Sequence, residues 1–417
     1  MEVVANNQVL DFVANLKKPT DISQVRQQAL NALNGMDFPH RRIEEWKYTR
    51  VSKYVKRKYN QQTAEIDAQN IFLEEKMHQL VFVNGYFDKS QSTVIDDDAL
   101  TIRTIEEVDN NYYSEVMEDI DENVFSVINK AYQTGGVYLH VKADTKVKYP
   151  IHIVHLLVGN EVIANVRHFI HIEKGSKAEV LVTFNSKNSE NSFTNVVFEG
   201  EVEENATLTI NKLQSETKDV LHISREFFVQ EEGSTFKMNT ITTGGELTRN
   251  QLDVIVEGKN CYTEMNGAYL GIDKQHIDNH TYVDQMASHC ITNELYKGVM
   301  NDSSTGVFNG MILVRPDSQK IEAYQSNKNV LLSEKASIYS KPELEIYADD
   351  VRCSHGSTIG ELDQQALFYL RSRGINKSEA EQLLVSAFIG DVLDKIENDA
   401  VRKQVDKIFL ENYGWKF

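Results

Sequence analysis

One short turn sequence recurs along the middle of the chain, and its spacing limits the possible folds more than any other feature. Acidic residues precede a glycine or an asparagine in EKGSKAEV, EENATLTI, EEGSTFKM and EGKNCYTEM, and MASHCITN is a looser copy. The turn residues are Gly175, Asn205, Gly233, Asn260 and Ser288, which are spaced by 30, 28, 27 and 28 residues. A fixed period in this range predicts stacked structural repeats.

The residues between these turns have the composition of strands. From residue 137 to about 347, β-branched and aromatic residues alternate with polar ones in short runs. Because these repeats contain no helical pattern, a β-helix or solenoid fits them better than a helical array. A two-sheet sandwich or jelly roll is the main alternative, although neither needs a fixed period.

Helical patterns flank this strand-rich region on both sides. Before it, the sequence predicts helices over residues 9–17, 21–34 and 114–131, and a hairpin over residues 80–87 through Asn84-Gly85. After it, helices are predicted over residues 363–372, 376–396 and 400–412. We therefore expect a mostly helical N-terminal domain (1–136), a β-helix core (137–360) and a helical C-terminal domain (361–417).

The charge balance and the cysteine count limit the partners that this chain can have. With 62 acidic and 44 basic residues, the formal charge of −18 repels nucleic acid and anionic membranes. No apolar run reaches 18 residues and the N-terminus is too polar for a signal peptide, so we expect a cytoplasmic protein. The three cysteines include no C-x-x-C pair, so any metal cluster would need ligands from another chain.

The sequence contains none of the common nucleotide-binding or hydrolytic motifs. We find no G-x-x-x-x-G-K-[ST] loop, no G-x-G-x-x-G after a strand, no G-x-S-x-G and no H-E-x-x-H. If the function of this chain needs ATP, we expect another protein to hydrolyse it.

The densest group of metal-capable side chains lies between residues 349 and 355. Cys353 and His355 are two residues apart, so on a strand they share one face and form half of a site for a soft or borderline metal. Asp349 and Asp350 are neighbours and point to opposite faces, so an ion pair with Arg352 or a capping role is the better interpretation for them. With two ligands alone, the spacing of Cys353 and His355 favours a structural role.

Two other pairs of histidine or cysteine residues have a spacing that could place their side chains together. His276 and His280 are four apart in a strand-rich region and could share a face, but no third ligand is evident, which favours surface or turn histidines. Cys261 and Cys290 lie one repeat apart, and buried structural thiols are the better interpretation for them.

The sequence also resembles a known family. The stretch SKPELEIYADDVRCSHGSTIGELDQQALFYLRSRGI (340–375) is similar to the C-terminal signature shared by the SufB and SufD proteins of the SUF iron–sulfur cluster assembly system. RRIEEWKYT (41–49), VFVNGYF (81–87) and NVFSVINKAYQTGGVYL (123–139) resemble the SufD branch, so the similarity covers nearly the whole chain.

This resemblance implies a fold, partners and a site. It implies a right-handed parallel β-helix with helical ends, in a non-catalytic scaffold subunit. The β-helix would pair with SufB, and the C-terminal helices would dock the ATPase SufC, with Leu367, Phe368 and Leu384 as candidate contacts. His355 matches the cluster-related histidine of the family at the SufB interface, and Cys353 is a weaker candidate.

The resemblance further implies a transient iron–sulfur cluster or iron shared with SufB, and no cluster bound stably by this chain alone. The sequence leaves open whether the isolated chain forms a homodimer. Two alternatives remain beside the scaffold: a β-helix enzyme that acts on carbohydrates, and a purely structural solenoid. No strand position within the repeats collects a recurring cluster of three or more Asp or Glu residues, which disfavours the enzyme.

Overall fold

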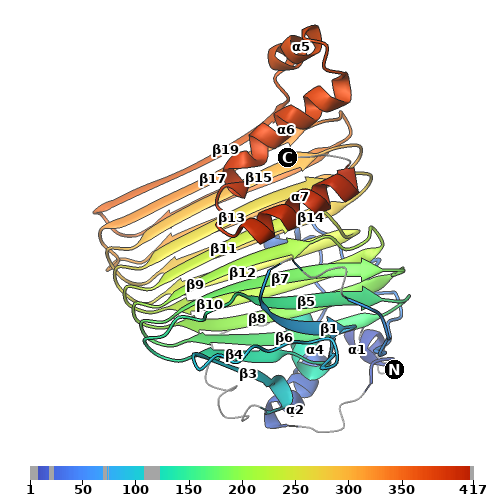
Figure 1. Cartoon of the computed structure of the whole chain (residues 1–417), viewed down its shortest axis with the longest axis vertical. Helices are drawn as coiled ribbons and strands as arrows, with labels where there is room; N and C mark the ends of the chain where they lie inside the picture. Colours follow the sequence, from blue (N-terminus) through green and yellow to red (C-terminus); the bar gives the residue numbers. More distant parts are fainter. Residues whose placement is uncertain (1–7, 18–22, 69–72, 74, 108–122, 414–417) are drawn as a thin grey trace, which may run out of the picture.

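Two long, mainly parallel sheets form the body of the protein, and the strands of each sheet are stacked one after another along the same axis (Figure 1). The structure, a computed structural model, describes residues 8–17, 23–68, 73, 75–107 and 123–413. Residues 21, 22 and 114–122 of two expected helices lie outside these ranges.

The strands alternate between the two sheets along the chain. Within the described ranges, sheet 1 has the order β19-β17-β15-β13-β11-β9-β7-β5-β1-β2 and sheet 2 has the order β18-β16-β14-β12-β10-β8-β6-β4-β3. The strands of sheet 1 are β1 (His78–Val83), β2 (Tyr86–Phe87), β5 (Ile151–Val158), β7 (Lys177–Lys187), β9 (Thr207–Gln214), β11 (Thr235–Thr242), β13 (Tyr262–Gly271), β15 (Ile291–Met300), β17 (Ile321–Leu331) and β19 (Val351–Glu361). The strands of sheet 2 are β3 (Leu100–Thr104), β4 (Val137–Val141), β6 (Ile163–Ile172), β8 (Ser192–Val202), β10 (Val220–Gln230), β12 (Leu247–Val256), β14 (His276–Gln285), β16 (Thr305–Val314) and β18 (Ser337–Ile346).

This strand order confirms the parallel β-helix and excludes the sandwich alternative. From β4 to β19, each strand pairs in parallel with the strand two places on in the sequence, so each turn of the solenoid contributes one strand to each sheet. The recurring turn residues explain the period. Gly175, Asn205, Gly233 and Asn260 all have positive φ, which glycine and asparagine tolerate best. In the fifth copy the positive φ falls on His289 instead of Ser288.

Alternate side chains of both sheets fill the space between them. Most are apolar, and Cys261 and Cys290 belong to this core, which confirms their interpretation as buried thiols. Some are polar, such as Lys212 and Glu226, which form an ion pair of 2.6 Å that is hidden from solvent. The interior therefore combines an apolar core with buried polar contacts, and the Lys212–Glu226 pair joins the two facing sheets.

The N-terminal segment is helical only in part. Its described helices are α1 (Gln8–Val13), α2 (Gln24–Ala32) and α4 (Val124–Ala131), with the short helices η1 (Leu33–Gly35), η2 (Glu44–Trp46) and η4 (Ile105–Glu107). The hairpin expected over residues 80–87 is confirmed as β1 and β2. Strands β1 and β3 extend the two sheets by pairing with β5 and β4, so the described residues of this segment also contribute strands to the solenoid. The boundaries of the three domains stay predictions.

The C-terminal helices behave as the sequence predicted. Helices α5 (Gln364–Ser372), α6 (Lys377–Leu393) and α7 (Asp399–Tyr413) match the three expected segments, and Asp363 and Asn376 cap the first two. The buried side chains of α7, Val401, Val405, Ile408 and Phe409, form one apolar stripe. With residues of α6, they pack on the outer face of sheet 1.

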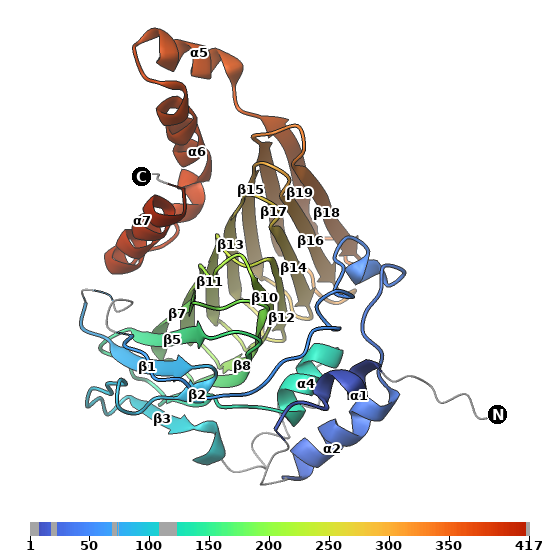
Figure 2. The ribbon, with the colours of Figure 1, turned by 90° about the vertical axis from the view of Figure 1, so that its right-hand side faces the viewer.

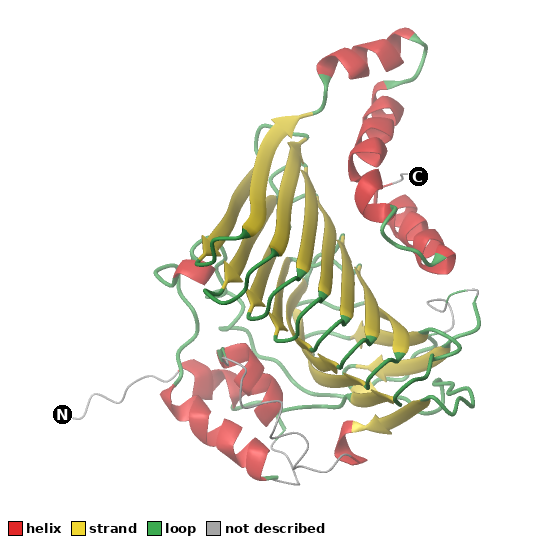
Figure 3. Ribbon diagram, turned by 90° about the vertical axis from the view of Figure 1, so that its left-hand side faces the viewer, coloured by secondary structure: helices red, strands yellow, loops and turns green. Residues whose placement is uncertain are grey.

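Helix α5 does not share this packing. It stands beyond the end of the sheets at the β19 side, whereas α6 and α7 lie along sheet 1 (Figures 2 and 3). None of the helices in the described ranges combines the length and the apolar character that crossing a membrane requires.

Candidate metal site

The solenoid ends in a turn that no further turn covers. Among the described residues, β18 pairs with β16 and β19 pairs with β17, and neither has a strand on its other side. Most residues of β19 are exposed, including Ile359 at 50%. A long, uncovered edge strand offers its unpaired backbone groups to another chain.

Cys353 and His355 lie on this last turn and share one face of β19, as their spacing predicts. Cys353 packs against the solenoid core, so its face is the one turned toward the interior. His355 is two residues further along the strand and is exposed, because no further turn of the described solenoid covers it. Burial raises the pKa of the Cys353 thiol, which favours its neutral form in this chain alone.

These two side chains form an incomplete ligand set. Imidazole and thiolate both suit iron, but iron sites in proteins need three or four ligands. Within the described part of the chain, no group of three or more His, Cys, Asp or Glu residues is placed to hold a metal ion. The remaining ligands would have to come from outside this part of the chain.

The acidic residues before this pair do not make the contact that the sequence suggested. Asp350 pairs with Lys320 and Arg352 lies 3.7 Å from Glu322, so the ion pair with Arg352 expected for these carboxylates is wrong for Asp350. The helix that follows is capped by Asp363, not by Asp349 or Asp350. Lys320 and Glu322 both come from the preceding turn of the solenoid. Their positions depend on how the turns stack, which local spacing does not reveal.

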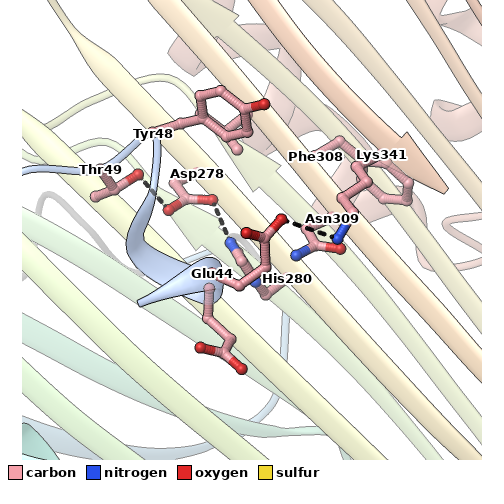
Figure 4. A pocket seen from close by; sticks show the side chains of 10 residues that line it. Glu44, Tyr48, Thr49, Asp278, His280, Phe308, Asn309 and Lys341 are labelled. Carbon is pink, nitrogen blue, oxygen red and sulfur yellow. Dashed lines mark hydrogen bonds and ion pairs between the residues drawn. The ribbon is translucent and has the colours of Figure 1, made fainter. Parts of the chain in front are cut away.

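His276 and His280 are not surface or turn residues. Both lie in β14 on the outer face of sheet 2, next to the segment 44–49: His276 Nε2 is 2.9 Å from Thr49 Oγ1, and His280 lines a pocket beside Glu44 and Tyr48 (Figure 4). Asp278 stands between them: its Oδ1 lies 2.9 Å from His280 Nε2, and its Oδ2 accepts a hydrogen bond from Thr49 Oγ1 at 2.5 Å. Burial, and then the positive charge of Arg249, lower the pKa of His280, so its ring is neutral near pH 7.

The segment 44–49 acts as a strap across sheet 2. Trp46 is buried, and its ring centroid lies 4.0 Å from the guanidinium carbon of Arg249. Arg249 also pairs with Asp278. Further along, Tyr48 stacks on Tyr339 of β18 with 4.3 Å between the ring centroids. The conspicuous RRIEEWKYT sequence is therefore an anchor for the N-terminal segment.

A cavity of about 540 Å³ adjoins the strap on the same face. Its carboxylates are largely neutralised by basic neighbours, since Asp253 pairs with Arg225, and Glu44 and Glu343 both lie within 3.2 Å of Lys341. Two free carboxyl groups facing one bond, which a glycoside hydrolase needs, do not occur among these pairs.

The three candidate docking residues have different surroundings. Phe368 is 75% exposed on α5, whereas Leu367 beside it is only 8% exposed. Leu384 on α6 is half-buried. A test of docking should therefore use Phe368, because a change at Leu367 would disturb packing as well.

Fold and site together define a parallel β-solenoid with helical ends, whose uncovered last turn carries an incomplete pair of metal ligands. Comparison with known families gives the same answer in more detail. Residues 155–388 match the profile described as "SUF system FeS cluster assembly, SufBD core domain", and residues 11–153 match "SufBD protein N-terminal region". The chain belongs to the SufBD family of the SUF iron–sulfur cluster assembly system.

Individual relatives agree with this assignment over most of their length. An iron–sulfur cluster assembly SufBD family protein of Synechocystis is 30% identical over 89% of this chain and 86% of its own. The iron–sulfur cluster assembly protein SufD of Escherichia coli is 28% identical over 93% of this chain and 92% of its own. SufD of Bacillus subtilis is 22% identical over 94% of both chains.

Proposed function

We propose that this chain is a non-catalytic scaffold subunit of a cytoplasmic SUF assembly complex. In this proposal its last solenoid turn pairs with SufB, its C-terminal helices dock the ATPase SufC, and an iron–sulfur cluster is assembled as cargo at the seam with SufB. The single observation that supports it best is the pair His355 and Cys353 on the uncovered edge strand β19.

The edge explains why a second chain would bind here. Strand β19 has eleven residues, from Val351 to Glu361, and among the described residues its outer edge is unpaired. Neither a proline nor a lysine, which commonly protect such edges, occurs in it. A partner strand would satisfy the backbone groups and cover Ile359 at the same time.

The chemistry explains why the partner would complete a site. His355 offers a ring nitrogen and Cys353 a thiol, and iron accepts both. Because this pair lies at the edge, a thiolate from SufB could reach the same ion. We propose that the cluster forms only when both subunits contribute, and that neither iron nor a cluster stays bound to this chain alone.

A reconstituted complex tests the proposal. We expect His355→Ala to lower the Fe–S absorbance per complex by about tenfold under anaerobic loading with iron and sulfide, while the subunits still co-purify. Ser354→Ala, one residue away on the opposite face of β19, is the matched control and should keep normal absorbance. Normal cluster formation by the His355→Ala complex would rule out the ligand role.

A further inference from the structure

A column of inward-facing side chains leads through the solenoid to His355. In the register of sheet 1, Glu294 of β15 is opposite Gln325 of β17, and Gln325 is opposite His355 of β19. Neighbouring strands of a sheet are about 4.8 Å apart, so side chains at paired positions on one face are neighbours. Gln325 is therefore the inward-facing residue next to His355 on the preceding turn.

The amide group of Gln325 is held from one side only. Its Nε2 donates to Glu294 Oε2 at 2.7 Å, and the other carboxyl oxygen of Glu294 accepts from Thr281 Oγ1 at 2.5 Å. Gln325 is 3% exposed, and its Oε1 is buried without a hydrogen-bond partner among the described residues. A buried acceptor without a hydrogen-bond donor costs free energy, so we expect this oxygen to accept a hydrogen bond from a neighbouring N–H group.

A glycine on the facing sheet provides the room for this arrangement. A Cβ atom added to Gly310 of β16 would lie 2.3 Å from Gln325 Nε2 and 2.9 Å from Thr281 Oγ1. Both contacts are shorter than real Cβ contacts allow. The position of the Gln325 amide therefore depends on the absence of a side chain at residue 310.

We propose that Gln325 is a positioning residue for His355, with its Oε1 accepting a hydrogen bond from an imidazole N–H. That bond fixes the tautomer and orientation of the ring and leaves the other nitrogen free to ligate iron, as partners behind metal-binding histidines generally do. The inference rests on the proposed function, because it assumes that His355 is the ligand.

Glu294 sets the direction of this hydrogen-bonded chain. An ionised carboxylate can only accept, so it keeps the amide nitrogen of Gln325 on its own side and the amide oxygen toward the last turn. Burial raises the pKa of Glu294 to about 7, so the carboxylate predominates at pH 8. A glutamine at position 294 could donate instead, which would allow the Gln325 amide to turn and present its nitrogen to His355.

Nitrogen-15 NMR of the full chain with labelled histidine tests the inference at pH 8. His355→Ala identifies the His355 signals. In the native chain we expect the ring nitrogens of His355 to show one tautomer in excess by about fivefold relative to an unconstrained imidazole, which is the effect of one ordinary hydrogen bond. Gln325→Met should remove this excess, and Glu294→Gln should reduce or invert it.

Two glycine variants serve as a matched pair. Gly310→Ala should displace the Gln325 amide and remove the tautomer excess without changing a polar group. Gly360→Ala lies in β19 itself, where an added Cβ meets no atom within 4 Å, and should leave the excess unchanged. If Gln325→Met fails to fold, the comparison of Gly310→Ala with Gly360→Ala still tests whether the tautomer excess depends on the position of the Gln325 amide.

The outcomes separate this inference from the proposed function. An unconstrained tautomer mixture for His355 in the native chain, or an excess that persists in folded Gln325→Met or Gly310→Ala, would overturn the positioning role even if His355→Ala abolishes cluster formation. A tautomer excess that depends on Gln325, together with normal cluster formation by His355→Ala, would support the positioning contact and reject the ligand role.

Discussion

At the scale of single residues, buried ions of sheet 2 hold the N-terminal strap in place. Asp278 is fully buried, and although burial alone would raise its pKa, the charge of Arg249 and the contact with His280 hold the pKa well below its usual range. Arg249 is buried too. Loss of the carboxylate would leave a guanidinium without its counter-charge in a dry environment.

We predict that Asp278→Ala lowers the free energy of unfolding by about 3–5 kcal/mol, as removal of one partner of a buried ion pair generally does. Denaturant unfolding followed by circular dichroism measures the change. Asp350→Ala is the control, because Asp350 pairs with Lys320 where both side chains are more than half exposed. The control should cost less than about 1 kcal/mol. Equal effects of the two variants would contradict the anchoring role of Asp278.

Glu294 makes a second prediction, which concerns pH. Its pKa of about 7 in the folded chain exceeds the value of 4.5 expected when unfolded, because it is fully buried. Between these values the unfolded chain releases a proton that the folded chain keeps, so the contribution of Glu294 to stability falls as pH rises from 4.5 to 7. The loss amounts to about 3 kcal/mol.

The comparison of native and Glu294→Gln proteins at several pH values isolates this contribution. Relative to the native chain, the free energy of unfolding of the variant should rise as pH increases from 4.5 to 7 and then level off. The same substitution at exposed Glu361 accounts for the loss of a surface carboxylate. A difference between native and Glu294→Gln proteins that does not change with pH would show that Glu294 does not titrate in this range.

At the scale of elements, the three C-terminal helices divide into two parts. Helices α6 and α7 bury a continuous apolar stripe on sheet 1. Lys297 Nζ of β15 also donates a hydrogen bond to Asp391 Oδ2 of α6 at 2.6 Å, which holds α6 on the sheet. Helix α5 stands clear of the sheets and exposes Phe368 and Tyr369. An exposed aromatic pair on a projecting helix is a typical anchor for a partner.

We predict that Phe368→Asp weakens SufC binding at least about tenfold without lowering the melting temperature of the chain. Isothermal titration calorimetry with the purified ATPase measures the affinity. Met286→Asp changes another exposed apolar residue, far from α5 in the sequence, and should leave the affinity unchanged. Unchanged affinity of Phe368→Asp would place the SufC contact elsewhere.

At the scale of the whole molecule, stability declines toward the open end. A solenoid is stabilised mainly by contacts between adjacent turns, and the last described turn has a neighbouring turn on one side only, whereas turns in the middle have one on each side. Strands β18 and β19 are accordingly exposed or half-buried, whereas β10 and β12 are nearly all buried. The end that carries His355 is thus less protected than the middle of the solenoid.

We predict that amides of β18 and β19 exchange hydrogen faster than those of β10 and β12 in the isolated chain, and become protected when SufB is added. Hydrogen-exchange mass spectrometry measures both rates. Ile359→Asp should prevent the protection, because it places a charge in the covered seam. The same change at Val94, which is 57% exposed outside the sheets, is the control. If other strands became protected and β18 and β19 did not, SufB would bind to a different part of the solenoid.

The sequence alone determined the features that depend on local periodicity. The spacing of the turn residues Gly175 to Asn260 predicted the solenoid, alternation predicted its strands, and helical and capping patterns predicted α5, α6 and α7. The shared face of Cys353 and His355 followed from the two-residue period of a strand. These features involve residues that are close in the chain, so their geometry follows from the backbone conformation.

Only the tertiary structure decided which distant side chains meet. The sequence did not indicate that Asp278 pairs with Arg249, that Asp350 pairs with Lys320, or that Gln325 lies between Glu294 and His355. These contacts join successive turns, and the turns differ in length by several residues, so the register is set by how whole turns pack. One residue of slip would move every one of these side chains to the opposite face of its sheet.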